Sequence, residues 1–320
     1  MSSPFHFPSL VWGESIAIYL FLLGISAGGT MISILLKRRG LLGENLAESN
    51  ILRCNAILAP VTIMIGLILL IFHLVRPWTF WYLMFNYQPH SIMSIGVMLF
   101  QVYMAMLCLW IAIIFKDLIL SIVRKIVPKL ENFVAKAIDF FARFNSVIET
   151  ILLLVSIALG AYTGFLLSAL VSYPMLNNPV LPILFLISGT SSGIAAIMLF
   201  TLLFTKEKTT SKAMSYLHSL EFPVVCSELF LLFAFFFGLY LGGGQKTVSM
   251  YTAIGGGFWS YVFWSGVVGI GLILPLSLTL IANEKLKHQR KFIYLTTGLT
   301  LLGVLCLRFF ILYAGQMTLA

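Results

Sequence analysis

Two basic side chains close to an aromatic segment could bind a flat molecule that carries carbonyl or hydroxyl oxygens. His73 and Arg76 are three residues apart, and Arg76 is the first residue of the run 76–81, Arg-Pro-Trp-Thr-Phe-Trp. On a helix, this spacing would place both side chains on one face, where they could bond to an oxygen while Trp78 stacks on the ring. In the alternative, Arg76 extends its charge into water and His73 bonds to a backbone carbonyl.

A tyrosine between two glycines is a second candidate for the same kind of site. Tyr162 and Thr163 lie between Gly160 and Gly164. Glycines allow another backbone or a flat ligand to come close, and the phenol can donate a hydrogen bond to that ligand. The alternative is that the tyrosine anchors its segment at a membrane surface.

The composition shows which elements must position these side chains. Hydrophobic residues make up 60% of the 320 residues and charged residues only 10%, whereas soluble proteins have about 25% charged residues. A water-soluble fold is therefore excluded, and we expect an all-α integral membrane protein with one membrane domain over 1–320. A helix needs about 20 apolar residues to cross the bilayer, and the sequence has eight such segments, at about 15–36, 54–74, 92–115, 147–170, 181–204, 222–241, 258–282 and 292–314.

The basic residues predict how these spans are oriented. An even number of spans puts both termini on one side, and cytoplasmic loops retain Lys and Arg. The first, third, fifth and seventh loops contain Lys37, Arg38, Arg39 and Arg53; Lys116, Arg124, Lys125, Lys129, Lys136 and Arg143; Lys206, Lys208 and Lys212; and Lys285, Lys287, Arg290 and Lys291. The opposite face has only Arg76 and Lys246. We therefore expect periplasmic termini in a bacterial inner membrane, and the net charge of +9 reflects this topology and not nucleic-acid binding.

The third loop is long enough to contain a helix of its own. Its apolar residues recur at helical spacing between basic residues, at Ile122, Ile126, Val127, Leu130, Val134, Ile138 and Phe141. Such a pattern is typical of a helix that lies on a membrane surface in contact with lipid. We expect an amphipathic cytoplasmic surface helix that is interrupted near Pro128.

Besides His73, three ionisable residues within or at the start of the spans are candidates for function, because a charge there is costly unless it is paired or hydrated. Glu14 begins the first span, either as a hydrogen-bond acceptor for a ligand or as a simple helix-start carboxylate. Glu228 is expected about one and a half turns into the sixth span, with Glu221 at the entrance. It suits a proton relay, and pairing with another helix is the alternative. Arg308 needs a counter-charge, which either Glu14 or Glu228 could provide.

Ligands for a resident redox cofactor are not evident in the sequence. A bis-histidine haem needs two histidines within the membrane, and only His73 is expected there. The four cysteines stand alone, without a C-x-x-C pair, so neither a cysteine-ligated metal nor a disulfide framework is expected. No motif for hydrolysis or phosphoryl transfer is present. The chain is therefore expected to bind no haem, iron–sulfur cluster or other metal.

Several segments carry a resemblance to a known family. They are 5–7 (FHF), 9–12 (SLVW), 16–22 (IAIYLFL), 72–74 (FHL), 76–81 (RPWTFW), 159–167 (LGAYTGFLL) and 308–316 (RFFILYAGQ). In these segments the sequence resembles the NrfD/PsrC family of integral membrane quinol-oxidising subunits, and the likeness extends over nearly the whole chain. It is strongest to the members that serve formate-dependent cytochrome c nitrite reductase systems.

The resemblance implies a function and a set of partners. Such a subunit has eight helices and no redox cofactor of its own, and it binds menaquinol, its substrate, near the periplasmic surface. It transfers electrons to a docked periplasmic four-cluster iron–sulfur protein, and from there to multihaem c-type cytochromes that reduce nitrite to ammonia. Membrane lipid is the only other partner expected.

The resemblance also implies where the quinol binds. In the family the site is built mainly by the first four helices, with a tyrosine in the fourth that corresponds to Tyr162. Some members have an amide and a histidine on the first helix, where this sequence has Glu14 and Tyr19. The candidate catalytic residues are therefore His73, Glu14 and Glu228, and the candidate quinol-binding residues are Arg76, Trp78, Tyr162, Thr163 and Tyr19.

Two other functions remain open at this point. A membrane anchor of a polysulfide, thiosulfate or tetrathionate reductase would use the same fold with a different terminal acceptor. A secondary transporter, from a different functional class, would use Pro60, Pro223 and Pro275 to break helices around a site in the middle of the membrane.

Overall fold

The computed structural model describes residues 4–43, 46–74 and 76–319 of the chain, so the predicted domain limits at residues 1 and 320 lie outside the described residues. Within these ranges every regular element is helical, and eight helices are long and apolar enough to cross a membrane. These are α1 (Glu14–Arg38), α2 (Asn50–His73), α4 (Ile92–Ile114), α7 (Asn145–Ser168), α8 (Leu181–Phe204), α9 (Lys212–Leu241), a seventh span over 258–281, and α14 (Arg290–Gly315). The predicted all-α, eight-span fold is confirmed.

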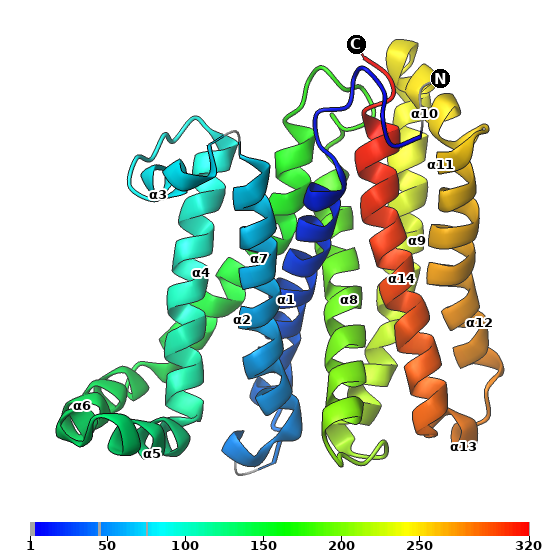
Figure 1. Ribbon diagram of the computed structural model, residues 1–320. Coiled ribbons are helices and arrows are strands. Elements are labelled where there is room, and N and C mark those ends of the chain that lie inside the picture. The colour runs from blue at the N-terminus through cyan, green and yellow to red at the C-terminus, as the bar shows by residue number, and fades with distance from the viewer. Residues whose placement is uncertain (1–3, 44–45, 75, 320) are drawn as a thin grey trace.

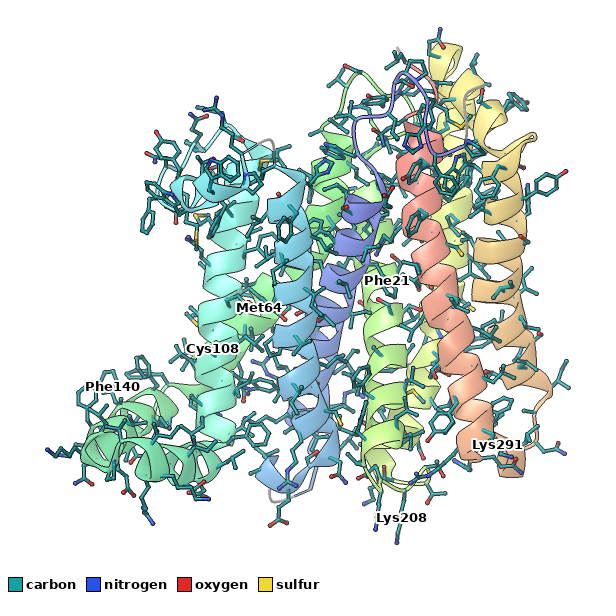
Figure 2. The ribbon with its side chains drawn as sticks, in the orientation of Figure 1. Phe21, Met64, Cys108, Phe140, Lys208 and Lys291 are labelled. Carbon is teal, nitrogen blue, oxygen red and sulfur yellow. The ribbon has the colours of Figure 1, made fainter. Side chains whose placement is uncertain are left out.

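The two ends of the helix bundle differ in what they contain. Both termini lie at one end, which we call the N/C end (Figure 1). The opposite end, which we call the basic end, contains the first, third, fifth and seventh loops, and Figure 2 shows Lys208 and Lys291 there. The side chain of Lys285, also predicted at this end, is outside the described part of the chain.

Two groups of four helices make up the bundle. The first group is α1, α2, α4 and α7, and the second is α8, α9, the seventh span and α14. The seventh span consists of the short helix α11 (Phe258–Tyr261), the π-helix η4 (Val262–Ile273) and α12 (Leu274–Ile281). Helices α1 and α8 are the most buried spans and pack against each other where the groups meet.

Small residues allow α1 and α8 to approach closely. A Cβ atom added at Gly28 would overlap the carbonyl oxygen of Gly189, and one added at Gly193 would overlap the backbone of Gly28 and Gly29. In a membrane, where lipid is as apolar as the side chains, helices associate largely through such close backbone packing. The glycines therefore fix the contact between the two groups.

Most predicted helix limits agree with the structure to within four residues, and the sixth span is the exception. Helix α9 begins at Lys212, ten residues before the predicted start at 222, because Ser211 caps it by accepting a hydrogen bond of 3.4 Å from the backbone N–H of Met214. The hydropathy pattern detects only the apolar part of a helix that extends beyond the membrane. Helices α2 and α9 also continue through Pro60 and Pro223, so these prolines do not produce the broken spans that a transporter site would use.

The third loop contains the surface element predicted from its apolar spacing. Helix α5 (Lys116–Ile126) and helix α6 (Glu131–Ala142) flank a short 3-10 turn, η3 (Pro128–Leu130), so the interruption at Pro128 is confirmed. At the N/C end, the segment 76–91 contains η2 (Pro77–Thr79) and α3 (Phe80–Leu83). The remaining short elements are η1 (Leu46–Glu48), α10 (Gly244–Ile254) and α13 (Glu284–Lys287).

Candidate functional site

An apolar cavity lies between α2, α4 and the segment 76–91, near the N/C end. Its volume is about 290 Å³, which is near the lower end of the range for clefts that hold small-molecule ligands, and one side of it is open to the surroundings of the bundle. The cavity exists because α2 and α4 make few direct contacts, although each packs against another helix of the first group. Its walls are mainly Leu, Met, Ile and Phe, including Met64, Leu67, Ile71, Met93, Phe100 and Met104.

Gln101 is the only polar residue among those lining the cavity in the described part of the chain. Its Nε2 donates a hydrogen bond of 3.1 Å to the carbonyl oxygen of Met84, and its Oε1 accepts one from the hydroxyl of Tyr87. Both partners belong to the segment 76–91. Gln101 therefore fastens this segment to α4 at the edge of the cavity.

Two buried tyrosines lie behind the cavity wall. The ring of Phe100, which lines the cavity, is 6.2 Å from the ring of Tyr162 in an edge-on arrangement and 6.2 Å from the ring of Tyr19. The phenol of Tyr162 occupies the space that a Cβ would need at Gly96. Neither the Tyr19 hydroxyl nor the Tyr162 hydroxyl makes a hydrogen bond within the described residues, whereas Tyr103, deeper in the same group, makes three, to the Ser26 and Thr30 side chains and to the Ser26 carbonyl.

Thr163, the neighbour of Tyr162, has its hydroxyl occupied within its own helix. The side chain is buried, and Oγ1 donates a hydrogen bond of 2.8 Å to the carbonyl oxygen of Gly160. Of Tyr162 and Thr163, only Tyr162 therefore has a hydroxyl without a hydrogen-bond partner among the described residues.

His73, Arg76 and Trp78 lie at the N/C end but outside the cavity wall. Helix α2 ends at His73, and Leu74 is extended with φ −69° and ψ 142°. The prediction that His73 and Arg76 share one helix face is therefore wrong. Both side chains are exposed, and Trp78 is 75% exposed, so it forms no roof over them. Within the described ranges no ring contact or hydrogen bond joins these residues to Tyr162.

Glu14 interacts with the last span. Its Oε2 accepts a hydrogen bond of 3.0 Å from the hydroxyl of Tyr313, whose ring stacks on Trp259 with centroids 4.7 Å apart. Glu14 is exposed at the start of α1. It is therefore tied to α14 at the N/C end and is not the counter-charge of Arg308.

Arg308 is buried in the core of the second group. Its guanidinium lies 3.8 Å from the centre of the Phe185 ring, and Nη2 donates a hydrogen bond of 3.2 Å to the Phe185 carbonyl oxygen. Nε and Nη1 have no hydrogen-bond partner within the described residues. The side chain interacts electrostatically with Glu228, although the two are not in direct contact as an ion pair. Of the two counter-charges considered, the structure favours Glu228.

Glu228 lies in the middle of α9. It is 16 residues after Lys212 and thus roughly 24 Å along the helix at 1.5 Å per residue. The ten residues of α9 before 222 precede its apolar part, so the predicted position about one and a half turns into the span is unchanged. The carboxyl is buried next to Ser191, and Oε2 has no partner within the described residues.

A second, small cavity lies beside Ser191, the neighbour of Glu228. Its volume is about 20 Å³, which is room for about one water molecule, and it is lined by Ser191, Glu221, Thr279 and Thr300 among others. Glu221 Oε2 is 2.8 Å from Nδ1 of His218. Ser191 therefore lies between the buried Glu228 and a cavity that Glu221 also lines.

Glu149 is a buried charge that sequence reasoning missed. It lies in α7, forms an ion pair with Lys37 of α1, and accepts a hydrogen bond of 3.2 Å from Nε1 of Trp110 in α4. The sequence contained a signal for this ion pair, because Glu149 lies near the start of α7 and Lys37 near the end of α1, both at the basic end of the bundle. Gln101 was missed as well, because no pattern in the apolar sequence of α4 distinguishes it from its neighbours. No group of three or more His, Cys, Asp or Glu in residues 4–43, 46–74 and 76–319 could hold a metal ion.

Comparisons with known proteins agree over the full length of the chain. Residues 2–320 match the profile of the family described as "Polysulphide reductase, NrfD". The chain is 55% identical to the "Protein NrfD homolog" of Haemophilus influenzae, over 99% of this chain and 98% of the relative. It is 48% identical to "Protein NrfD" of Escherichia coli (100% and 99%), and 39% identical to the C subunit of polysulfide reductase from Wolinella succinogenes (97% and 96%). The chain therefore belongs to the NrfD family of oxidoreductase membrane subunits and is a multi-pass protein of the bacterial inner membrane.

Proposed function

We propose that this protein oxidises menaquinol in the α2–α4 cavity as the membrane subunit of a multi-subunit oxidoreductase. Its electrons pass to a periplasmic four-cluster iron–sulfur protein and on to multihaem c-type cytochromes, which reduce nitrite to ammonia. Two full-length relatives that bear the name NrfD support this electron path over others. The subunit itself holds no haem or cluster, so after isolation it should show no Soret absorption band and no stoichiometric iron.

The observation that carries the proposal is a pair of tyrosine hydroxyls, behind an apolar cavity, that have no partner among the described residues. A quinol has an apolar ring and tail and two polar oxygens. The cavity provides apolar walls and an open side, while Tyr19, Tyr162 and Gln101 provide hydrogen-bonding groups beside Phe100. Both tyrosines are buried as residues, but their hydroxyl oxygens are not among the fully buried atoms without a partner, so both hydroxyls are free to bond to a ligand.

Oxidation of the quinol releases two electrons and two protons, and the protons need an acceptor. His73 is exposed at the end of α2, outside the cavity wall but between Ile71 and Leu74 in the chain, both of which line the cavity. We assign it as the proton acceptor on the side toward water, with Arg76 and Trp78 in the same exposed region of the N/C end as a second contact for a quinol that enters. Glu14, on the same end of the bundle, is the alternative acceptor.

The orientation belongs to the same proposal. With the basic end in the cytoplasm, the cavity, His73 and both termini face the periplasm, where the iron–sulfur partner docks. A reporter that is active only outside the cytoplasm should work when fused to the C-terminus, and one that is active only inside should work within 117–143. The reverse pattern would place the quinol cavity on the cytoplasmic side and exclude a periplasmic partner.

The decisive experiment measures oxidation of a menaquinol analogue by membranes that contain the partner proteins. Tyr162→Phe and Tyr19→Phe each remove one hydroxyl that would bond to the quinol. A hydrogen bond of this kind contributes about 1–3 kcal/mol, or roughly 5- to 150-fold in rate or affinity. Tyr240→Phe is the matched control, because Tyr240 is exposed on α9. Wild-type rates and inhibitor affinities in both cavity variants, at normal insertion levels, would rule out this site.

The second group suits a proton relay. We assign Glu228 to this role, because its carboxyl is buried, has an oxygen without a partner in the described residues, and lies next to Ser191, which lines a small cavity together with Glu221. Glu228→Gln should slow proton movement coupled to turnover while quinol binding is retained, and Glu228→Asp should restore part of the rate. If the rate of Glu228→Gln is unchanged across pH, Glu228 has a structural role only.

A polysulfide, thiosulfate or tetrathionate reductase anchor is the second candidate. The 39% identity to the C subunit of a polysulfide reductase favours it, and the cavity would serve it equally well. Purification of the complex distinguishes the two functions, because an iron–sulfur protein together with a pentahaem cytochrome in the same preparation would establish the nitrite pathway.

A further inference from the structure

The pair α5 and α6, which we call the hairpin, is held at the level of the membrane surface. Only Phe115 separates α4 from α5, and only Arg143 and Phe144 separate α6 from α7. Because α4 and α7 pack together as spans, both ends of the hairpin are fixed where these spans end. Figure 1 shows the hairpin extending sideways from the foot of α4, away from the rest of the bundle.

An apolar stripe follows each helix of the hairpin. On α5 the spacing is four residues and on α6 it is seven and four, so the members of each stripe share one helix face. Figure 2 shows Phe140 on the side of α6 that is turned toward the level of the spans. These side chains remain 48–73% exposed on α5 and 50–71% exposed on α6 and at Phe144, which follows α6 and continues its stripe: Leu118, Ile122, Ile126, Phe133, Phe140 and Phe144.

Two ion pairs join the helices of the hairpin and use two of its carboxylates. Lys116 Nζ is 2.5 Å from Asp139 Oδ1, and the Arg124 guanidinium binds both oxygens of Glu131. The hydrogen bonds from Arg124 hold the pKa of Glu131 below its usual range, so this pair stays charged at neutral pH. These four side chains are therefore engaged within the hairpin.

The remaining charges of the hairpin are mostly positive. Lys125, Lys129, Lys136 and Arg143 are exposed and form no ion pair with the described residues, and Asp117 is the only other carboxylate on the hairpin. An apolar stripe bordered by unpaired basic side chains complements a surface that has apolar chains below and negative charge above.

We propose that the hairpin is a binding site for anionic phospholipid, with the apolar stripe among the acyl chains and the four unpaired basic side chains at the phosphate groups. Both the attachment to the span ends and the charge balance favour a lipid surface over a soluble protein. The proposal depends neither on the direction of electron transfer nor on which end of the bundle faces the cytoplasm.

Native mass spectrometry of the intact, detergent-solubilised protein tests the site directly. Phosphatidylglycerol and phosphatidylcholine with the same acyl chains are titrated separately, and inorganic phosphate serves as a competitor without acyl chains. The protein should retain phosphatidylglycerol preferentially, and phosphate should compete poorly because it lacks the apolar part. Each basic residue near an anionic surface contributes roughly fivefold in affinity, so Lys125→Gln with Lys129→Gln and Lys136→Gln should lose at least tenfold.

The matched control changes three lysines at the same end of the bundle. Lys206 and Lys208 in the loop before α9, and Lys212 at the first position of α9, are exposed and lie outside the hairpin, so their replacement by Gln should leave phosphatidylglycerol binding within about twofold of wild type. Equal losses in both triple variants, or no preference for the anionic lipid in the wild type, would overturn the proposal. Binding that phosphate abolishes would assign the site to a free anion instead.

A second measurement tests the apolar stripe by itself. Trypsin cleaves after Lys125 and Lys129, and in phosphatidylglycerol nanodiscs these bonds should be cut several times more slowly than in phosphatidylcholine nanodiscs. Phe133→Ser with Phe140→Ser should remove this protection while leaving cleavage in the loop of Lys206 and Lys208 unchanged. If protection appears only after a partner protein is added, the stripe is a protein-docking surface and the lipid proposal fails.

Discussion

The first group of helices leaves an open, almost wholly apolar space between α2 and α4, whereas the second group encloses Arg308 and Glu228 in a core that lipid does not reach. Around this space the polar groups are phenols and one amide, which are neutral at physiological pH, and the buried ion pair of Glu149 with Lys37 lies apart from it at the basic end. In the second group the enclosed charges are a guanidinium and a carboxyl. One protein thus contains an environment suited to a lipid-soluble ligand and another suited to charge, divided by the close contact of α1 and α8.

The difference between the two groups follows from the free-energy cost of burying each kind of polar side chain. A buried cation is expensive in a membrane, and Arg308 reduces that cost through the Phe185 carbonyl, the Phe185 ring and the electrostatic attraction of Glu228. Neutral hydroxyls carry a smaller cost when they lack partners. An open, exchangeable site can therefore contain Tyr19 and Tyr162, but an unpaired charge there would be difficult to keep.

The largest expected effect comes from separating the buried charges of the second group. Glu228→Leu leaves the Arg308 guanidinium without its counter-charge. Removing one partner of a buried ion pair in direct contact typically costs about 3–5 kcal/mol, which is the upper limit here because the two groups do not touch. Arg308→Met should cost less, because Glu228 can become neutral by binding a proton. The unfolding temperature of the solubilised protein measures both.

The double variant Glu228→Leu with Arg308→Met decides whether the two residues act as a pair. Coupled residues show non-additive changes in stability, so the double variant should be more stable than Glu228→Leu alone. Additive losses would mean that each charge is stabilised separately, and the contrast between the two helix groups would then rest on the cavity alone.

Filling the space beside Tyr162 should have the next largest effect, and it should be confined to the first group. Gly96→Val places methyl groups where the Tyr162 phenol lies, and overpacking of this kind costs about 1–3 kcal/mol. We expect the loss of menaquinol oxidation to exceed tenfold. Gly298→Val is the control, because a Cβ at Gly298 meets nothing within 4 Å, and equal losses in both variants would contradict the site.

Gln101→Leu should produce a smaller, kinetic change. It removes the hydrogen bonds to Met84 and Tyr87, each worth about 0.5–1.5 kcal/mol, and so loosens the segment 76–91 without adding bulk. The KM for a menaquinol analogue should change severalfold, and the unfolding temperature should change little. A large fall in kcat with KM unchanged would instead indicate that the amide itself contacts the reacting quinol.

The smallest effect is expected at Thr163, directly beside Tyr162. Its hydroxyl is bonded to Gly160 within α7, so Thr163→Val should leave the rate of menaquinol oxidation within about twofold of wild type. A loss as large as that of Tyr162→Phe would show that the quinol site extends past the tyrosine to the other face of α7.

The positions of the site residues were predicted less well than the elements that carry them. Tyr162 was found through its glycine neighbours and the family resemblance, and the structure places it beside the cavity with Tyr19. His73 and Arg76 were expected on one helix face, but α2 ends at His73. The start of the helix that carries Glu228 was placed ten residues too late, because a hydropathy pattern does not show that α9 extends beyond its apolar part.

Length and hydropathy by themselves determined the eight spans, the placement of both termini at one end, and the surface hairpin with its break at Pro128. These are properties of each segment alone, because the bilayer sets how long an apolar run must be. Which side chains meet was decided only by the tertiary structure. The spans are apolar nearly all round, so no pattern within them fixes which face turns inward. The pairing of Arg308 with Glu228, of Gln101 with Met84, and of Tyr19 with Tyr162 through Phe100 follows from how the helices pack.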